Sequence, residues 1–142
     1  MKELRLLIVE DAPLVGPTTR AILKREGHHV AGVATTPIKT HRLVRRARAD
    51  LALIDLKLAD GGRGLDVARQ LRGELGVSCL IITGYQLRAH EVGKAALGIL
   101  HKPFSPAAPI KAVAVAGELL AGRPPSMPHR SLNYADIHHL AE

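Results

Sequence analysis

The sequence predicts an α/β domain, a doubly wound five-stranded parallel sheet with helices on both faces. Two observations lead to this fold class. Short apolar runs alternate five times with segments of helical length and pattern over residues 1–122 of the 142-residue chain. The runs are apolar at nearly every position, which is typical of parallel strands that are buried on both faces.

The predicted strands are the apolar runs themselves, of which the second is weakly apolar and the fifth is short. They are residues 4–9, 29–34, 51–55, 77–83 and 98–101. Four of the five strands end at a polar residue or are followed directly by one. This placement matters for function, because ligands of an open parallel sheet bind at the carboxyl ends of its strands.

The predicted helices fill the intervals between these strands. They span residues 13–26, 37–47, 65–75, 88–96 and 110–120, and the fourth has the weakest pattern. Gly27 and Gly76 are expected to end the first and third helices, and Thr36 is expected to cap the second in front of Pro37. The apolar spacing places Leu14, Thr18, Ala21, Ile22 and Arg25 along one side of the first helix. The stripe of the last helix consists of Ile110, Val113, Ala114, Gly117 and Leu120.

Composition and charge exclude several classes of protein. No apolar run has the length of a membrane span, and the single Cys79 allows no disulfide within the chain, which fits a cytoplasmic protein. The net charge of +7 raises nucleic acid as a partner, but three aromatic residues are too few for a base-stacking platform. The basic stretch HRLVRRAR, residues 41–48, is interpreted as a solvated helix face in preference to a phosphate-binding one.

The last residues, 123–142, form a Pro-rich spacer and a short tail outside the predicted domain of residues 1–122. A disordered tail and a short amphipathic helix both remain open for this segment. It is too short for a second domain.

Polar groups from four strands should meet at one edge of the sheet. They are Glu10 and Asp11 after the first strand, Asp55 at the end of the third, Thr83 at the end of the fourth, and Lys102 after the fifth. Clustered carboxylates favour a hard cation such as Mg²⁺, with Mn²⁺ as an alternative. Lys102 and Thr83 suit the oxygens of a phosphoryl group, and Asp55 is the candidate nucleophile that would form an acyl phosphate.

Each of these residues also has an ordinary structural interpretation. Glu10 or Asp11 alone would serve as the N-cap of the helix near Pro13, and Asp55 alone would start the turn that follows its strand. Thr83 and Lys102 alone carry little information. Their joint placement at the ends of separate strands favours the functional interpretation.

The motifs resemble the receiver domain of response regulators in two-component signalling, over residues 4 to about 120. The matching segments, in family order, are LLIVEDAPLV, LALIDLKLADG, LIITGY and LHKPF. The resemblance implies a flavodoxin-like receiver fold with Asp55 as the phosphoacceptor. It further implies Asp11 and Glu10 as magnesium ligands, the second through water, and a backbone carbonyl of Lys57 as another ligand. Thr83 and Lys102 would bind the phosphoryl oxygens.

Three features depart from the family pattern. Ile99 stands where the family usually has the Tyr or Phe that turns inward on activation, so the usual readout is in doubt, and Tyr85 is the alternative switch residue. Ala59 replaces a common proline in a Gly-rich loop. We expect no DNA-binding or enzymatic output domain after the receiver segment.

We therefore expect a stand-alone response regulator that accepts phosphate from a histidine kinase or a histidine phosphotransfer protein. Its output would be contact with a downstream protein, or it would act as a phosphate sink in a phosphorelay. We expect a phosphoprotein switch with slow self-dephosphorylation and not an enzyme, with no membrane partner and no nucleic acid, while homodimer formation stays open.

Three rival functions compete with this expectation. A receiver-like binding module that is never phosphorylated is kept open by Ile99. An aspartyl-phosphate phosphohydrolase commonly needs a second acid two residues after the nucleophile, where this chain has Lys57. A flavin carrier would share the fold but needs a Ser/Thr-rich phosphate loop after the first strand.

Overall fold

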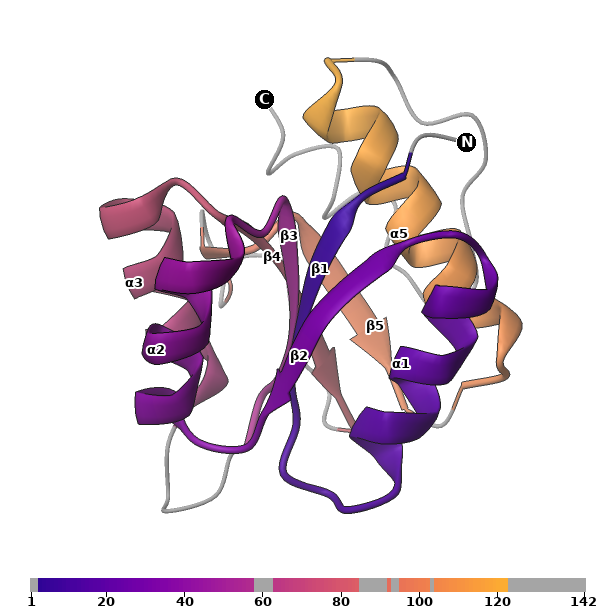
Figure 1. Cartoon of the computed structure of the whole chain (residues 1–142), viewed down its shortest axis with the longest axis horizontal. Coiled ribbons are helices and arrows are strands. Elements are labelled where there is room, and N and C mark those ends of the chain that lie inside the picture. The colour runs from indigo at the N-terminus through magenta and orange to yellow at the C-terminus, as the bar shows by residue number, and fades with distance from the viewer. Residues whose placement is uncertain (1–2, 58–62, 85–91, 93–94, 103, 123–142) are drawn as a thin grey trace.

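The structure is a computed structural model, and it describes residues 3–57, 63–84, 92, 95–102 and 104–122. Strands and helices alternate from residue 5 to residue 83, and a fifth strand and a last helix follow, as Figure 1 shows. The strands are β1 (Arg5–Val9), β2 (His29–Ala34), β3 (Leu51–Asp55), β4 (Ser78–Thr83) and β5 (Gly98–His101). The helices are α1 (Val15–Arg25), α2 (Pro37–Ala47), α3 (Gly64–Leu75) and α5 (Ala107–Leu120).

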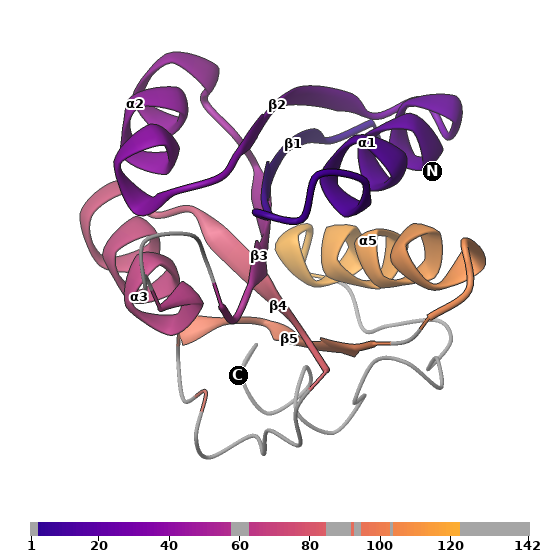
Figure 2. The ribbon, with the colours of Figure 1, turned by 90° about the horizontal axis from the view of Figure 1, so that it is seen from below.

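The five strands form one parallel sheet in the order β2-β1-β3-β4-β5. Helices α2 and α3 cover one face, and α1 and α5 cover the other, which both views show (Figures 1 and 2). The prediction of a doubly wound sheet is therefore confirmed. The predicted helix at 88–96 lies largely outside the described residues, and the tail 123–142 lies outside them entirely.

The core consists of two aliphatic clusters, one on each face of the sheet. Along β1, Leu6 and Ile8 pack toward α1 and α5, whereas Leu7 and Val9 pack toward α2 and α3. Successive side chains alternate between faces because a strand has a period of two. Cys79 is buried in the second cluster, and burial raises the pKa of its thiol to about 12 against a smaller opposing effect of Arg72.

The helix ends follow the local sequence. Thr36 caps α2, since its Oγ1 accepts a hydrogen bond from the Lys39 backbone N–H at 3.2 Å, and Pro37 is the first helical residue. Gly76 ends α3 with a φ of +67°. A left-handed conformation of this kind favours glycine, so the predicted stops are confirmed.

The faces that two of the helices bury differ from the predicted ones. In α1 the buried residues are Gly16, Thr19 and Leu23, and Leu14 is 79% exposed. A Cβ on Gly16 would lie 2.6 Å from Val33 Cγ1, so close approach of small residues sets the contact face instead of the aliphatic spacing. The predicted side through Leu14 was therefore wrong.

In α5 the apolar spacing was similarly uninformative about which side is buried. Its sequence AAPIKAVAVAGELL is apolar almost all round, and its buried residues include Ala108, Ala112 and Ala116, whereas Leu120 is exposed. When a helix is apolar on every side, the sequence has no distinct apolar stripe that would identify the contact face. Among the described residues, no helix has the length and apolarity to span a membrane.

Candidate functional site

The polar residues predicted to converge come from the carboxyl ends of several strands of the sheet. Glu10 follows β1, Asp55 ends the adjacent β3, and Lys102 follows β5 at the far edge of the sheet. Lys102 Nζ lies 2.9 Å from Glu10 Oε1 and 3.4 Å from Asp55 Oδ2. The structure therefore brings Lys102 into contact with Glu10, 92 positions away in the sequence, and with Asp55, 47 positions away.

The carboxylates differ strongly in exposure. The side chain of Glu10 is 2% exposed and that of Asp55 is 13% exposed, whereas Asp11 is exposed to solvent. Burial raises the pKa of Glu10 to about 7, helped by the nearby carboxylate of Asp55 and opposed by Lys102. Near neutral pH the buried Glu10 carboxyl is therefore poised between its protonated and charged forms.

Lys102 holds the two carboxylates together. Burial alone would lower the pKa of its ammonium, but hydrogen bonding to Glu10 and the charges of Glu10 and Asp55 outweigh this effect and raise it. The lysine is thus held in its charged form while it bridges two acids. A single positive charge does not neutralise three carboxylates, so the cluster keeps a net attraction for a further cation.

The donor set fits a divalent cation. Glu10, Asp11 and Asp55 each offer a carboxylate oxygen, and these oxygens lie within 4.8 Å of one another. All three donors are hard oxygens, which suit Mg²⁺ or Mn²⁺. Because Asp11 is exposed, an ion held here would also be reachable by oxygens of an incoming ligand.

Asp55 is positioned by the backbone around it. β3 lies in the middle of the sheet between β1 and β4, and its residues Leu51 to Ile54 are fully buried. After the strand, the Leu56 N–H donates to Ile82 O at 2.9 Å, and the Gly64 N–H donates to Leu56 O at 2.8 Å. These bonds fix the direction in which the chain leaves the strand, and with it the carboxylate.

Gly64 is a positioning residue that the sequence pattern did not single out. A Cβ at this position would lie 2.1 Å from Asp55 O and 3.0 Å from Leu56 Cα, both backbone atoms. Only glycine therefore allows the start of α3 to pack against the end of β3. The available signal was the Gly-rich loop after Asp55, in which Gly64 is the last glycine.

The structural alternatives for the acidic residues have different outcomes. Neither Glu10 nor Asp11 caps α1, because the N-cap is Leu14 and no side chain caps that helix end. Glu10 Oε2 instead accepts a long hydrogen bond from the Ala12 N–H at 3.4 Å. Asp55 does support the turn, since its Oδ1 accepts from the Lys57 N–H at 3.2 Å while Oδ2 faces Lys102.

The remaining predicted site residues take the following positions. Thr83 is buried at the end of β4, and its carbonyl accepts from the Lys102 N–H at 2.7 Å. Lys57 is exposed immediately after the site strand, and Tyr85 lies outside the described residues. Ile99 is fully buried opposite Ile81, within the core cluster on the α2 and α3 face. The structure thus gives the positions of Thr83, Lys57 and Ile99, and their chemical roles stay predictions.

Comparison with known proteins agrees with this geometry. The family model for the response regulator receiver domain matches residues 6–114. The phyllosphere-induced regulator PhyR of Methylorubrum extorquens is 36% identical over 105 residues, which cover 72% of this chain and 39% of PhyR. ArcA of Escherichia coli K12 is 33% identical over 113 residues, 75% of this chain and 45% of ArcA. The chain thus spans less than half the length of these curated relatives.

Solved structures give the same result. The receiver domain of a modulated diguanylate cyclase from Desulfovibrio desulfuricans has a TM-score of 0.75 and 25% identity, covering 84% of this chain and 98% of that one. The response regulator PhyR from Brucella abortus has a TM-score of 0.66 and 26% identity, covering 82% of this chain and 52% of that one. The chain belongs to the response regulator receiver domain family.

Proposed function

We propose that the chain accepts a phosphoryl group on Asp55, from a phosphohistidine donor, with a divalent cation at the acidic cluster. The observation that carries the proposal is the contact of Lys102 Nζ with both Glu10 and Asp55. An ammonium between the candidate nucleophile and a second acid suits the oxygens of an incoming phosphoryl group. Membership of the receiver family supports a phosphoacceptor role in two-component signalling.

The proposed transfer is a displacement at phosphorus. A carboxylate oxygen of Asp55 forms a bond to phosphorus as the phosphorus–nitrogen bond of the donor breaks, and the electron pair leaves with the imidazole, which takes up a proton. Lys102 then shifts its hydrogen bond from Asp55 to a phosphoryl oxygen. A bound divalent cation supplies charge neutralisation for the carboxylates and the phosphoryl group.

The burial of Glu10 has a direct consequence for this step. A carboxyl with a pKa of about 7 is partly protonated at neutral pH in the metal-free protein, and binding of a cation favours its charged form. Cation binding is therefore expected to release a proton and to weaken as the pH falls below 7. Phosphorylation should follow the same dependence.

We also infer that the chain acts as a switch and not as an enzyme. Its output would be contact with a downstream protein, or drainage of phosphate from a relay, and a stand-alone mode of action is part of this proposal. The competing candidate is a receiver-like module that binds without phosphorylation. Ile99, fully buried at the position of the usual family aromatic, is the observation that favours it.

The test is the intact mass of the protein after incubation with acetyl phosphate and Mg²⁺. We expect an acid-stable, alkali-labile gain of one phosphoryl group that is lost in Asp55→Asn and in the presence of a chelator. Asp66→Asn is the matched control, because Asp66 is an exposed carboxylate on α3, and it should keep the gain. Should a folded protein show no gain with acetyl phosphate or with purified histidine kinases, the binding module is the better account.

A further inference from the structure

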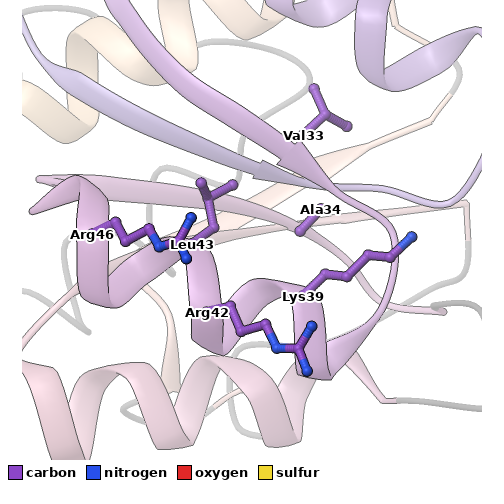
Figure 3. A pocket seen from close by; sticks show the side chains of 6 residues that line it. All are labelled: Val33, Ala34, Lys39, Arg42, Leu43 and Arg46. Carbon is purple, nitrogen blue, oxygen red and sulfur yellow. The ribbon is translucent and has the colours of Figure 1, made fainter.

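A groove beside α2 is lined by basic and aliphatic side chains and lies apart from Asp55. Its lining residues are Val33, Ala34, Lys39, Arg42, Leu43 and Arg46, and its volume is about 310 Å³. Figure 3 shows the three long cationic side chains extending from α2 beside Leu43, with Val33 and Ala34 contributed by the end of β2. The groove thus combines a cationic rim with an apolar floor.

The cations of the groove are not neutralised by the protein. Lys39, Arg42 and Arg46 are exposed, and no ion pair joins any of them to a carboxylate within the part of the chain that the structure describes. Lys39 Nζ does donate a hydrogen bond to Thr35 Oγ1 at 3.3 Å. Helix α2 carries no acidic residue, so like charges three and four positions apart destabilise it.

The spacing of the cations indicates an elongated ligand. Lys39, Arg42 and Arg46 lie three, then four positions apart and therefore share one side of the helix. Seven residues of helix correspond to roughly 10 Å. A single small anion cannot contact charges spread over this length, whereas a chain with several carboxylates can.

The floor of the groove distinguishes a peptide from a nucleic acid. The aliphatic floor is formed mainly by the half-exposed Leu43, because Val33 packs toward α1 and α5 and Ala34 is buried at the edge of the groove. Among the described residues, no aromatic side chain lines the groove for base stacking. A sugar-phosphate backbone carries no aliphatic side chain that could fill this floor, whereas a peptide can place one there. In addition, β2 is an edge strand of the sheet among the described residues, so its outer backbone groups face away from β1.

We propose that this groove binds an acidic peptide segment of a partner protein, with an aliphatic side chain on the floor and carboxylates against Lys39, Arg42 and Arg46. The surface does not involve the acidic cluster, so binding is expected in the unphosphorylated protein. The two sites are nevertheless adjacent, because the Glu10 N–H donates to Ala34 O at 2.9 Å.

The test is selection from a displayed library of random short peptides on the full, unphosphorylated chain. Peptides that bind should be rich in Asp and Glu around an aliphatic residue. Their synthetic forms, measured by fluorescence anisotropy, should bind the Arg42→Glu, Arg46→Glu double variant at least about tenfold more weakly than the original protein. The double variant Arg42→Gln, Arg46→Gln, which avoids charge reversal, should give a smaller loss.

The matched control is Lys24→Glu with Arg25→Glu, which makes the same change in net charge on exposed positions of α1. This control should stay within about twofold of the original affinity. Equal weakening by the control, selected peptides without acidic residues, or unchanged binding after the aliphatic residue is replaced by Ser would each overturn the proposal. Displacement of the peptide by an equal concentration of single-stranded DNA would make nucleic acid the occupant instead.

Discussion

The acidic cluster and the basic groove lie next to each other but handle charge in opposite ways. In the cluster, Glu10, Asp55 and Lys102 are largely buried, and opposite charges meet at 2.9 and 3.4 Å. In the groove, charges of one sign lie along an exposed helix face without carboxylate partners in the described residues. Burial gives each charge of the cluster a large desolvation free energy, whereas the exposed charges of the groove keep most of their hydration.

This difference shows why net charge is a poor guide to the function of the chain. The overall charge of +7 comes from exposed residues such as those of α2, yet the chemistry is expected at three carboxylates. Substitutions in the cluster should change stability strongly and with pH. Substitutions in the groove should change stability only slightly, and the size of the change should depend on the salt concentration.

The largest effect is expected where the backbone fixes the cluster. Gly64→Ala places a methyl group against Asp55 O, and overpacking against backbone should lower the free energy of unfolding by about 3 kcal/mol. Gly73→Ala, in the same helix with nothing within 4 Å, should instead raise it by about 0.5 kcal/mol. Urea unfolding of both variants checks this, and similar values for the two would contradict a steric role of Gly64.

The next effect concerns Glu10 in the chelated protein. Its pKa is about 7 in the folded chain and 4.5 when unperturbed, so the folded state binds more protons and stability falls as pH rises from 4.5 to 7. Glu10→Gln should remove this slope and, after allowance for solvent screening, gain about 2 kcal/mol at pH 8. Urea titrations across this range in a chelator provide the measurement, and parallel pH profiles for the two proteins would refute it.

A smaller effect with the opposite sign is expected at His28. Its side chain is buried, its Nδ1 accepts from the Leu4 N–H at 3.1 Å, and its Nε2 has no hydrogen-bond partner among the residues that the structure describes. Burial lowers the pKa of this imidazole below 6.5, with Glu26 and Glu3 opposing, so its stabilising contribution is present above pH 6.5 and is lost on acidification.

Stability should therefore fall through His28 between pH 7 and pH 5, by less than the change expected at Glu10. This loss is best measured in the Glu10→Gln background, which lacks the opposing slope, by comparing that variant with Glu10→Gln, His28→Asn. If both lose the same stability on acidification, another group is responsible.

The smallest effect is expected in the groove. Arg42→Glu converts like-charge neighbours at Lys39, Arg45 and Arg46 into attractive pairs and should stabilise the protein by about 0.5 kcal/mol at low salt. Arg69→Glu on α3 breaks the 3.4 Å ion pair with Asp66 and should destabilise the protein slightly. Thermal unfolding at low and high salt tests both signs, since screening should abolish each effect. A gain that persists at high salt would point to a cause other than charge.

Strand positions and the convergence of the site were predictable from sequence for one reason. β1 and β3 are almost entirely apolar, β1 is followed by Glu10 and β3 ends in Asp55, and a parallel sheet brings such ends to one edge. The pattern needs no knowledge of side-chain packing. Three strands were predicted with their observed bounds, and β1 and β4 each begin one residue later than predicted.

Helix faces and positioning residues were not predictable in the same way. The contact face of α1 depends on Gly16 lying against Val33, and the start of α3 depends on Gly64 lying against Asp55. Both are close approaches between different elements of the fold, and a glycine in one sequence does not reveal which atoms it approaches. The protonation of Glu10 likewise results from burial, which appears only when β1, β3 and the residue after β5 are assembled.

The buried thiol described in the fold has a practical consequence for following this protein in motion. Cys79 is the only cysteine in the chain, it is fully buried, and its pKa is about 12, so it carries almost no reactive thiolate at neutral pH. A cysteine introduced at an exposed position of α2 or α1 would therefore take a fluorophore or spin label selectively in the otherwise unaltered chain. Distances between a labelled helix and a labelled peptide or donor could then be recorded without first removing a native residue.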